Sequence, residues 1–173
     1  MALLGPEGED AWGRLRLHAD VTKEFWLAFV FTSSQLQARQ LEERMAELLA
    51  SRGRRQRVLV PSTAEELHEL VPAILDEESQ AAHCIWVEAV HLDPAGAEVK
   101  PWAEAWSWLI QRANERRERL RRDLPGGLIF VAPPELKGTL REAGPDLWSI
   151  RATSLDLAPV ARSPAAAPAL EES

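Results

Sequence analysis

The sequence predicts an α/β domain, a three-layer α/β/α sandwich around a mostly parallel five-stranded sheet in the order 5-1-4-3-2. The first observation is the stretch 25–40, where a buried apolar run passes through two serines into an amphipathic helix. The second is the alternation of strands with helices along the chain, which is typical of a parallel sheet between helix layers. Right-handed crossovers then leave few possible strand orders.

Apolar runs and turn residues give the expected strands, which are residues 25–32, 58–60, 83–93, 128–132 and 147–157. The first strand is apolar at both its odd and its even positions, as expected of a strand that helices cover on both faces. Apolar positions spaced by three and four give the expected helices, which are residues 10–19, 35–52, 64–77, 101–123 and 135–143. For residues 10–19 an edge strand is the alternative. Gly53 ends the second helix, and Pro101 begins the longest one.

The length of 173 residues suits one domain with a single large core. Residues 1–9 contain two glycines and a proline, and we expect a flexible lead-in there. The domain itself should occupy residues 10–157. Residues 158–173 are rich in proline and alanine, and we expect a disordered tail. The sequence Asp93-Pro94-Ala95-Gly96 predicts a turn.

Composition narrows the class of protein. Acidic residues outnumber basic ones by 27 to 20, for a net charge near −7, which argues against a broad nucleic-acid-binding surface. No apolar run approaches the length of a membrane span, and the N-terminus is acidic where a secretion signal is basic. The single cysteine, Cys84, lies among apolar residues and cannot form an internal disulfide. We expect a cytoplasmic protein that binds neither nucleic acid nor membrane.

The loop after the first strand lacks the residues of a phosphate cradle. Such a cradle needs glycines, so that several amides can turn inward, and a lysine followed by Ser or Thr. Residues 33–40 contain neither glycine nor lysine. Glu88 is expected inside the third strand and Asp93 at its tip, both without a basic clamp for phosphate. We therefore expect no catalysis, no cofactor and no metal.

The four histidines fall on different expected elements without ligand spacing, and we interpret them as ordinary residues: His18, His68, His83 and His91. A candidate interaction surface lies instead on the helix expected at 101–123. Trp108 points away from the apolar stripe of this helix, whose polar side carries Arg112, Arg116 and Arg119. Local packing of Trp108 against a loop is the alternative for the tryptophan. For the arginines, the alternatives are a self-paired solvated face, with Glu118 and Arg122 spaced as an ion pair, or a nucleic-acid contact.

The second half of the chain carries a family resemblance. Asn114 and Arg117, a strand ending in Pro133-Pro134, and the run Pro145-Asp146-Leu147-Trp148-Ser149 resemble bacterial STAND-type proteins. These are nucleotide-switch ATPases with a P-loop fold, related to NLR immune receptors and often linked to tetratricopeptide repeats. The likeness covers most of residues 10–157. Because the phosphate loop departs from the pattern, the chain resembles most the inactive branch that lacks the Walker A motif.

The resemblance implies a scaffold of bacterial signalling or anti-phage conflict systems, which couples adaptor domains to effectors such as proteases or pore formers. No catalytic residue carries over. We interpret five motif residues as structural, tying the long helix to the last strand: Asn114, Arg117, Asp146, Trp148 and Arg151. Asp146 is expected to anchor the turn after Pro145, with Arg151 as its charge partner.

These observations predict a non-catalytic protein-interaction or adaptor module whose partners are other proteins. The alternative is a sensor that binds a nucleotide or another small anion without hydrolysing it. Its site would be the mouth at the carboxyl ends of the strands, where open parallel sheets place their ligands. That mouth would comprise Thr32–Gln35, His91–Asp93 and Ala132–Pro134.

Overall fold

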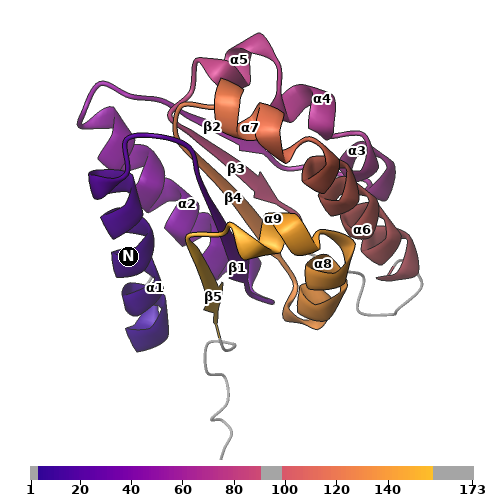
Figure 1. Ribbon diagram of the computed structural model, residues 1–173. Helices are drawn as coiled ribbons and strands as arrows, with labels where there is room; N and C mark the ends of the chain where they lie inside the picture. The colour runs from indigo at the N-terminus through magenta and orange to yellow at the C-terminus, as the bar shows by residue number, and fades with distance from the viewer. Residues whose placement is uncertain (1–3, 91–98, 158–173) are drawn as a thin grey trace, which may run out of the picture.

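A computed structural model describes residues 4–90 and 99–157 (Figure 1). It contains a five-stranded, all-parallel sheet in the order β2-β3-β4-β1-β5, so the predicted fold class and strand order are confirmed. The strands are β1 (Trp26–Phe31), β2 (Gln56–Leu59), β3 (Cys84–Glu88), β4 (Gly127–Ala132) and β5 (Thr153–Asp156). Asp93–Gly96 and the tail 158–173 lie outside the described residues.

The centre of the sheet is the pair β1 and β4, which run in register from Trp26 beside Gly127 to Phe31 beside Ala132. All six residues of each strand are buried. Gly127 is required here, because a Cβ at this position would lie 2.5 Å from the Trp26 ring, which crosses over it. Since the central strands are buried on both faces, each face needs its own layer of helices.

One face is covered by α1 (Gly5–Val21) and α2 (Gln35–Ala50), which lie side by side in Figure 1. The strand side chains that point to this face, including Val30, Trp86 and Ile129, form a core with these two helices. Met45 and Leu41 of α2 are fully buried in it.

The opposite face carries the remaining helices, of which α6 is the longest (Figure 1). The strand side chains Phe29, Phe31 and Phe130 pack there against Trp106 of α6. The elements are α3 (Ala64–His68), α4 (Val71–Ile74), α5 (Glu77–Gln80), α6 (Val99–Glu115), α7 (Arg117–Asp123), the 3-10 turn η1 (Pro134–Leu136), α8 (Lys137–Ala143) and α9 (Pro145–Ser149).

The N-terminal prediction needs correction. Residues 5–9 belong to α1 and are not a flexible lead-in, and α1 extends well beyond the predicted 10–19. Pro6 occupies the first turn, where its missing amide hydrogen costs nothing, and Gly8 packs closely on Leu4. The glycines at 5 and 8 therefore start and pack a helix.

The helix predicted at 64–77 is three short helices. α4 begins at Val71 within the predicted span, and Pro72 lies in its first turn because it cannot continue the hydrogen bonding of α3. Asp76 begins α5, since its Oδ1 accepts a hydrogen bond of 2.9 Å from the Ser79 amide. Two helix starts thus lie where the apolar spacing indicated one continuous helix.

The helix predicted at 101–123 is interrupted at Arg116, between α6 and α7. The Arg117 side chain donates a 2.9 Å hydrogen bond to the Asn114 carbonyl near the interruption. The strand predicted at 147–157 is also wrong in its first half. Pro145 starts α9, so Leu147 and Trp148 are helical, and β5 is limited to Thr153–Asp156.

The five motif residues join α6 and α7 to α9, rather than to a strand. Asn114 Oδ1 accepts a 2.7 Å hydrogen bond from the Leu147 amide, and Arg117 lies 3.5 Å from the Asp146 carboxylate. Arg151 is not the partner of Asp146. Its guanidinium lies 4.2 Å from the centre of the Trp148 ring and donates to the Trp148 carbonyl at 2.7 Å.

Trp148 provides the apolar contact between α9 and the sheet. Its ring packs on Phe29 and Phe31 of β1, at centroid distances of 5.0 and 6.2 Å. Gly144, just before α9, allows the close approach to α6, because a Cβ there would lie 2.7 Å from Ile110 Cγ2. The motif therefore positions a short helix against the sheet.

We expect Asn114→Ala to lower the free energy of unfolding by about 1–3 kcal/mol, because the Leu147 amide loses its acceptor. Asn114→Asp keeps an acceptor oxygen at the same position and should retain most of the stability. Urea unfolding of both variants measures the difference. Equal losses for Ala and Asp would show that the hydrogen bond is not the source of the effect.

Candidate functional site

The four residues of the predicted interaction surface line one groove, of about 530 Å³. Trp108, Arg112, Arg116 and Arg119 form the wall on the side of α6 and α7. The opposite wall comes from the segment 68–76, which contains α4. Its lining residues are His68, Glu69, Val71, Pro72, Leu75 and Asp76.

Trp108 is held in place but not buried. Its ring stacks on His68 at a centroid distance of 4.9 Å and an angle of 6°. Arg112 lies 5.6 Å from the centre of the same ring. Even so, 39% of the Trp108 surface is exposed. An aromatic face that is oriented in advance and still open to solvent suits a contact with another molecule.

The arginines of this groove have weak partners within the protein. Arg116 lies 3.8 Å from Glu115, and Arg119 lies 3.3 Å from Asp123, in pairs that solvent reaches. Arg112 makes no ion pair with any described residue. The predicted pair of Glu118 with Arg122 does not form, because Glu118 lies beside Arg121 and Arg122 beside Asp123.

The acidic residues of the opposite wall are engaged locally. Asp76 accepts a 2.6 Å hydrogen bond from Arg57 as well as capping α5. Glu69 lies 2.9 Å from His68 Nδ1. The carboxylates of this wall therefore have partners other than the arginines across the groove, which leaves the arginine wall the more available side for an anion.

The loop between β1 and α2 satisfies its own polar groups. The Thr32 hydroxyl donates to Gln37 Oε1 at 2.6 Å and accepts from the Ser34 amide at 3.1 Å. The Ser34 hydroxyl accepts from the Gln37 amide at 3.0 Å, as the N-cap of α2. Two amides that could face a phosphate at this helix start thus donate to side chains of the loop itself.

The predicted position of Glu88 needs a correction. It is the last residue of β3, at the carboxyl end of the strand and not inside it, and it is 2% exposed. Trp86 Nε1 donates a 3.0 Å hydrogen bond to its carboxylate. Burial raises the pKa of nearby Glu42, and the negative charge of Glu88 raises it further. Asp93 and His91 lie outside the described residues.

Among the described residues, the other polar candidates do not form a metal site. Within residues 4–90 and 99–157, no group of three or more His, Cys, Asp or Glu is arranged to hold a metal ion. Burial raises the pKa of the Cys84 thiol, which is enclosed in the core. None of the described helices is long and apolar enough to cross a membrane.

Comparison with known proteins supports the fold. A scan against protein-family models finds no match, and a search of curated proteins finds none either. The solved structure of the Aeropyrum pernix ORC2 protein in its ADPNP-ADP complexes is similar over 92% of this chain, with a TM-score of 0.50 and 14% identity. Its ADP form covers 88% of the chain, with a TM-score of 0.48 and 14% identity.

This chain spans about half of the first ORC2 chain, 48% of its length. At 14% identity the similarity shows the fold alone. The chain therefore has a P-loop-NTPase-like fold, and the coarse part of the predicted family resemblance agrees with this result.

The sequence did not indicate the residues of the far wall. His68 was interpreted as ordinary, yet its ring forms the base on which Trp108 stacks. Forty positions separate the two residues, and only the packing of α3 against α6 brings them together. A histidine without ligand spacing carries no local signal of such a contact.

We expect Trp108→Ala to lower the free energy of unfolding by no more than about 1.5 kcal/mol, since the ring is partly exposed and loses mainly its stacking on His68. Trp106→Ala, two residues earlier in α6, removes a fully buried ring and should cost about 3–5 kcal/mol. Thermal unfolding of both variants makes the comparison. Similar losses would place Trp108 in the core and remove it from the interaction surface.

Proposed function

We propose that this protein is a non-catalytic interaction module, and that the groove beside Trp108 receives an acidic segment of a partner protein. The observation that carries the proposal is the gathering of an exposed, oriented tryptophan and three arginines on one wall of a single groove. Tryptophan and arginine are the residues most enriched at the energetic centres of protein interfaces.

The charges of the groove favour an acidic partner. Arg112 has no ion-pair partner among the described residues, and the pairs of Arg116 and Arg119 are exposed enough to exchange for a carboxylate from outside. A partner residue that covers Trp108 would exclude water and strengthen the neighbouring charge pairs. The net charge of the chain, near −7, makes a nucleic-acid strand a poor alternative occupant.

The hydrogen bonds at the carboxyl ends of the strands support the non-catalytic part of this proposal. The loop after β1 has no glycine or lysine, and its hydroxyls and amides bond to one another. The Glu88 carboxylate is engaged by Trp86. Phosphate binding there would require these hydrogen bonds to be broken without a basic residue of the loop to replace them.

The resemblance to inactive, Walker-A-lacking STAND modules gives the proposal a biological setting. In that setting the protein is a cytoplasmic adaptor in bacterial signalling or anti-phage conflict. It binds another adaptor domain or an effector such as a protease or pore former. The motif residues Asn114 and Asp146 act there through the fold, by holding α9 against α6 and α7.

The test compares the affinities of three variants and the unaltered protein for a purified partner. The partner is first captured from the native host with the unaltered protein, and its affinity is then measured by titration calorimetry. We expect Trp108→Ala and Arg112→Glu each to weaken binding by about tenfold or more. Arg121→Glu makes the same charge change on α7 outside the groove and should have little effect.

Equal effects of Arg112→Glu and Arg121→Glu would show that only the overall charge matters. Unchanged affinity in both groove variants would place the interface elsewhere on the molecule. Either result contradicts the groove as the binding surface.

The second candidate is a sensor that binds a nucleotide without hydrolysing it. The position of Glu88 favours it, because a buried carboxylate at the carboxyl end of the third strand is where such folds hold magnesium. The proposed adaptor role predicts no shift of the melting temperature with ATP, ADP or GTP and magnesium. A rise of several degrees at millimolar nucleotide, lost in Glu88→Gln, would favour the sensor and contradict the adaptor proposal.

A further inference from the structure

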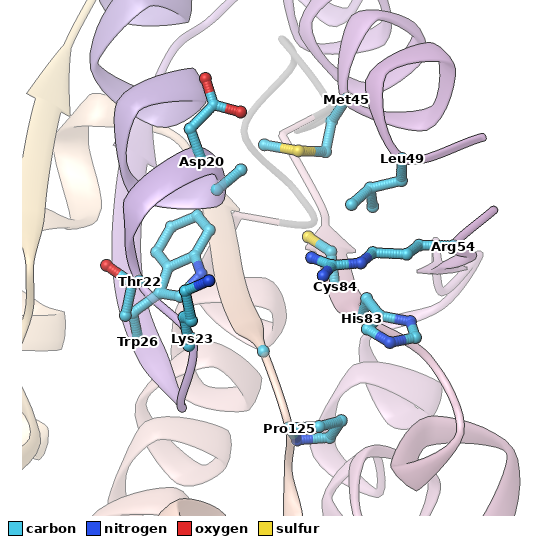
Figure 2. A pocket seen from close by; sticks show the side chains of 12 residues that line it. Asp20, Thr22, Lys23, Trp26, Met45, Leu49, Arg54, His83, Cys84 and Pro125 are labelled. Carbon is cyan, nitrogen blue, oxygen red and sulfur yellow. The ribbon is translucent and has the colours of Figure 1, made fainter. Parts of the chain in front are cut away.

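A second hollow lies at the amino ends of the strands, away from the groove beside Trp108 and from the loop after β1. Its volume is about 240 Å³ (Figure 2). It lies where β1, β3 and β4 begin, next to the ends of α1 and α2. The lining residues are Ala19, Asp20, Thr22, Lys23, Trp26, Met45, Leu49, Arg54, His83, Cys84, Pro125 and Gly126.

The walls of this cavity combine apolar surface with positive charge. Trp26, Met45 and Leu49 supply the apolar part, and each is almost fully buried. Figure 2 shows Trp26 and Lys23 on one side and Arg54 and His83 on the other. An anion with a flat apolar body would meet both kinds of surface.

The acidic residue of the lining does not balance these charges. Asp20 forms an ion pair with Arg52 and lies 3.6 Å from Arg16, so its carboxylate is already shared by two guanidinium groups. Lys23 and Arg54 make no ion pair with the described residues. The cavity therefore has an excess of positive charge.

His83 provides an independent observation. Its ring nitrogen Nδ1 is enclosed and has no hydrogen-bond partner among the described residues. Burial lowers the pKa of His83, and the charges of Arg54 and Arg55 lower it further. A buried polar atom without a partner is uncommon in folded proteins, and here it belongs to a residue that lines the cavity.

The backbone around His83 fixes this arrangement. The His83 amide donates to the Arg55 carbonyl at 2.8 Å, and its carbonyl accepts from the Gly127 amide at 3.2 Å. Gly126 allows the close approach, since a Cβ there would lie 2.1 Å from the His83 oxygen. The histidine is thus held on both sides, and the cavity is built by the start of the sheet.

We propose that this cavity binds a small organic anion, a carboxylate or phosphate monoester with a flat apolar body. The anionic group is bound by Lys23, Arg54 and His83, and the apolar body lies against Met45, Leu49 and the edge of the Trp26 ring, whose faces are covered by His18 and Gly127. The site is separate from the groove of the proposed interaction module and does not depend on it. Its ligand is of the size of a substituted benzene ring, as the volume of the cavity requires.

The test is a titration of the full chain with phenyl phosphate and benzoate, followed through the His83 ring signals by NMR. We expect saturable binding, together with a rise of the pKa of His83 because the bound anion stabilises its charged form. Phenol, which lacks the charge, and inorganic phosphate, which lacks the apolar body, should each bind more weakly. If phenyl phosphate binds and benzoate does not, the ligand is a phosphate ester; the reverse result identifies a carboxylate.

Two variants test whether phenyl phosphate binds in this cavity. Arg54→Gln should weaken the binding of phenyl phosphate by about tenfold, as expected for the loss of a charge-assisted hydrogen bond. Arg55→Gln is the matched control, because this neighbouring arginine does not line the cavity. Both side chains are exposed, so both variants should keep the melting temperature of the unaltered protein.

Several results would overturn the proposal. One is the absence of saturable shifts at millimolar phenyl phosphate and benzoate. Another is an equal effect of Arg54→Gln and Arg55→Gln, which would show general attraction to surface charge. A third is phenol binding as tightly as phenyl phosphate, which would make the cavity an apolar pocket without anion selectivity.

Discussion

The burial of β1 and β4 on both faces is the constraint on which the rest of the structure depends. Every residue of these two strands is enclosed, and their side chains alternate between two separate cores. Phe29 and Phe130 face the layer with α6, while Val30 and Ile129 face α1 and α2. Neither helix layer can be removed without exposing a continuous apolar face of the sheet. The groove and the cavity both lie at the margins of these layers.

The sequence predicted the sheet well because the signal of a buried strand is local. The runs 25–32 and 128–132 are apolar at both parities, and the handedness of crossovers limits the strand order. The errors arose where local spacing fits two structures. Leu147, Trp148 and Ile150 are as compatible with a strand as with a helix, and tertiary packing of Trp148 on Phe29 accompanies the helix. At 64–77 the apolar spacing is continuous and does not indicate that new helices begin at Val71 and Glu77.

Only one wall of the candidate groove could be predicted from the sequence. Trp108 could be selected from sequence because it departs from the apolar stripe of its own helix, and the arginines because they share its polar side. The opposite wall could not be selected. His68 and Asp76 belong to a segment whose place beside α6 follows from the crossover between β2 and β3. The location of Glu88 also required the observed end of β3, since the sequence pattern continues past it.

The hydrogen bonding of the loop after β1 differs from that of His83 at the other end of the sheet. At the carboxyl end, where folds of this type place their ligands, Thr32, Ser34 and Gln37 bond to one another. Each of those bonds contributes about 1 kcal/mol, so an anion that displaced them would first have to overcome this closed arrangement. At the amino end, His83 Nδ1 is enclosed without a partner among the described residues, and Lys23 and Arg54 line the same cavity. The imbalance that an anion would correct therefore lies at the end of the sheet opposite to the usual ligand site.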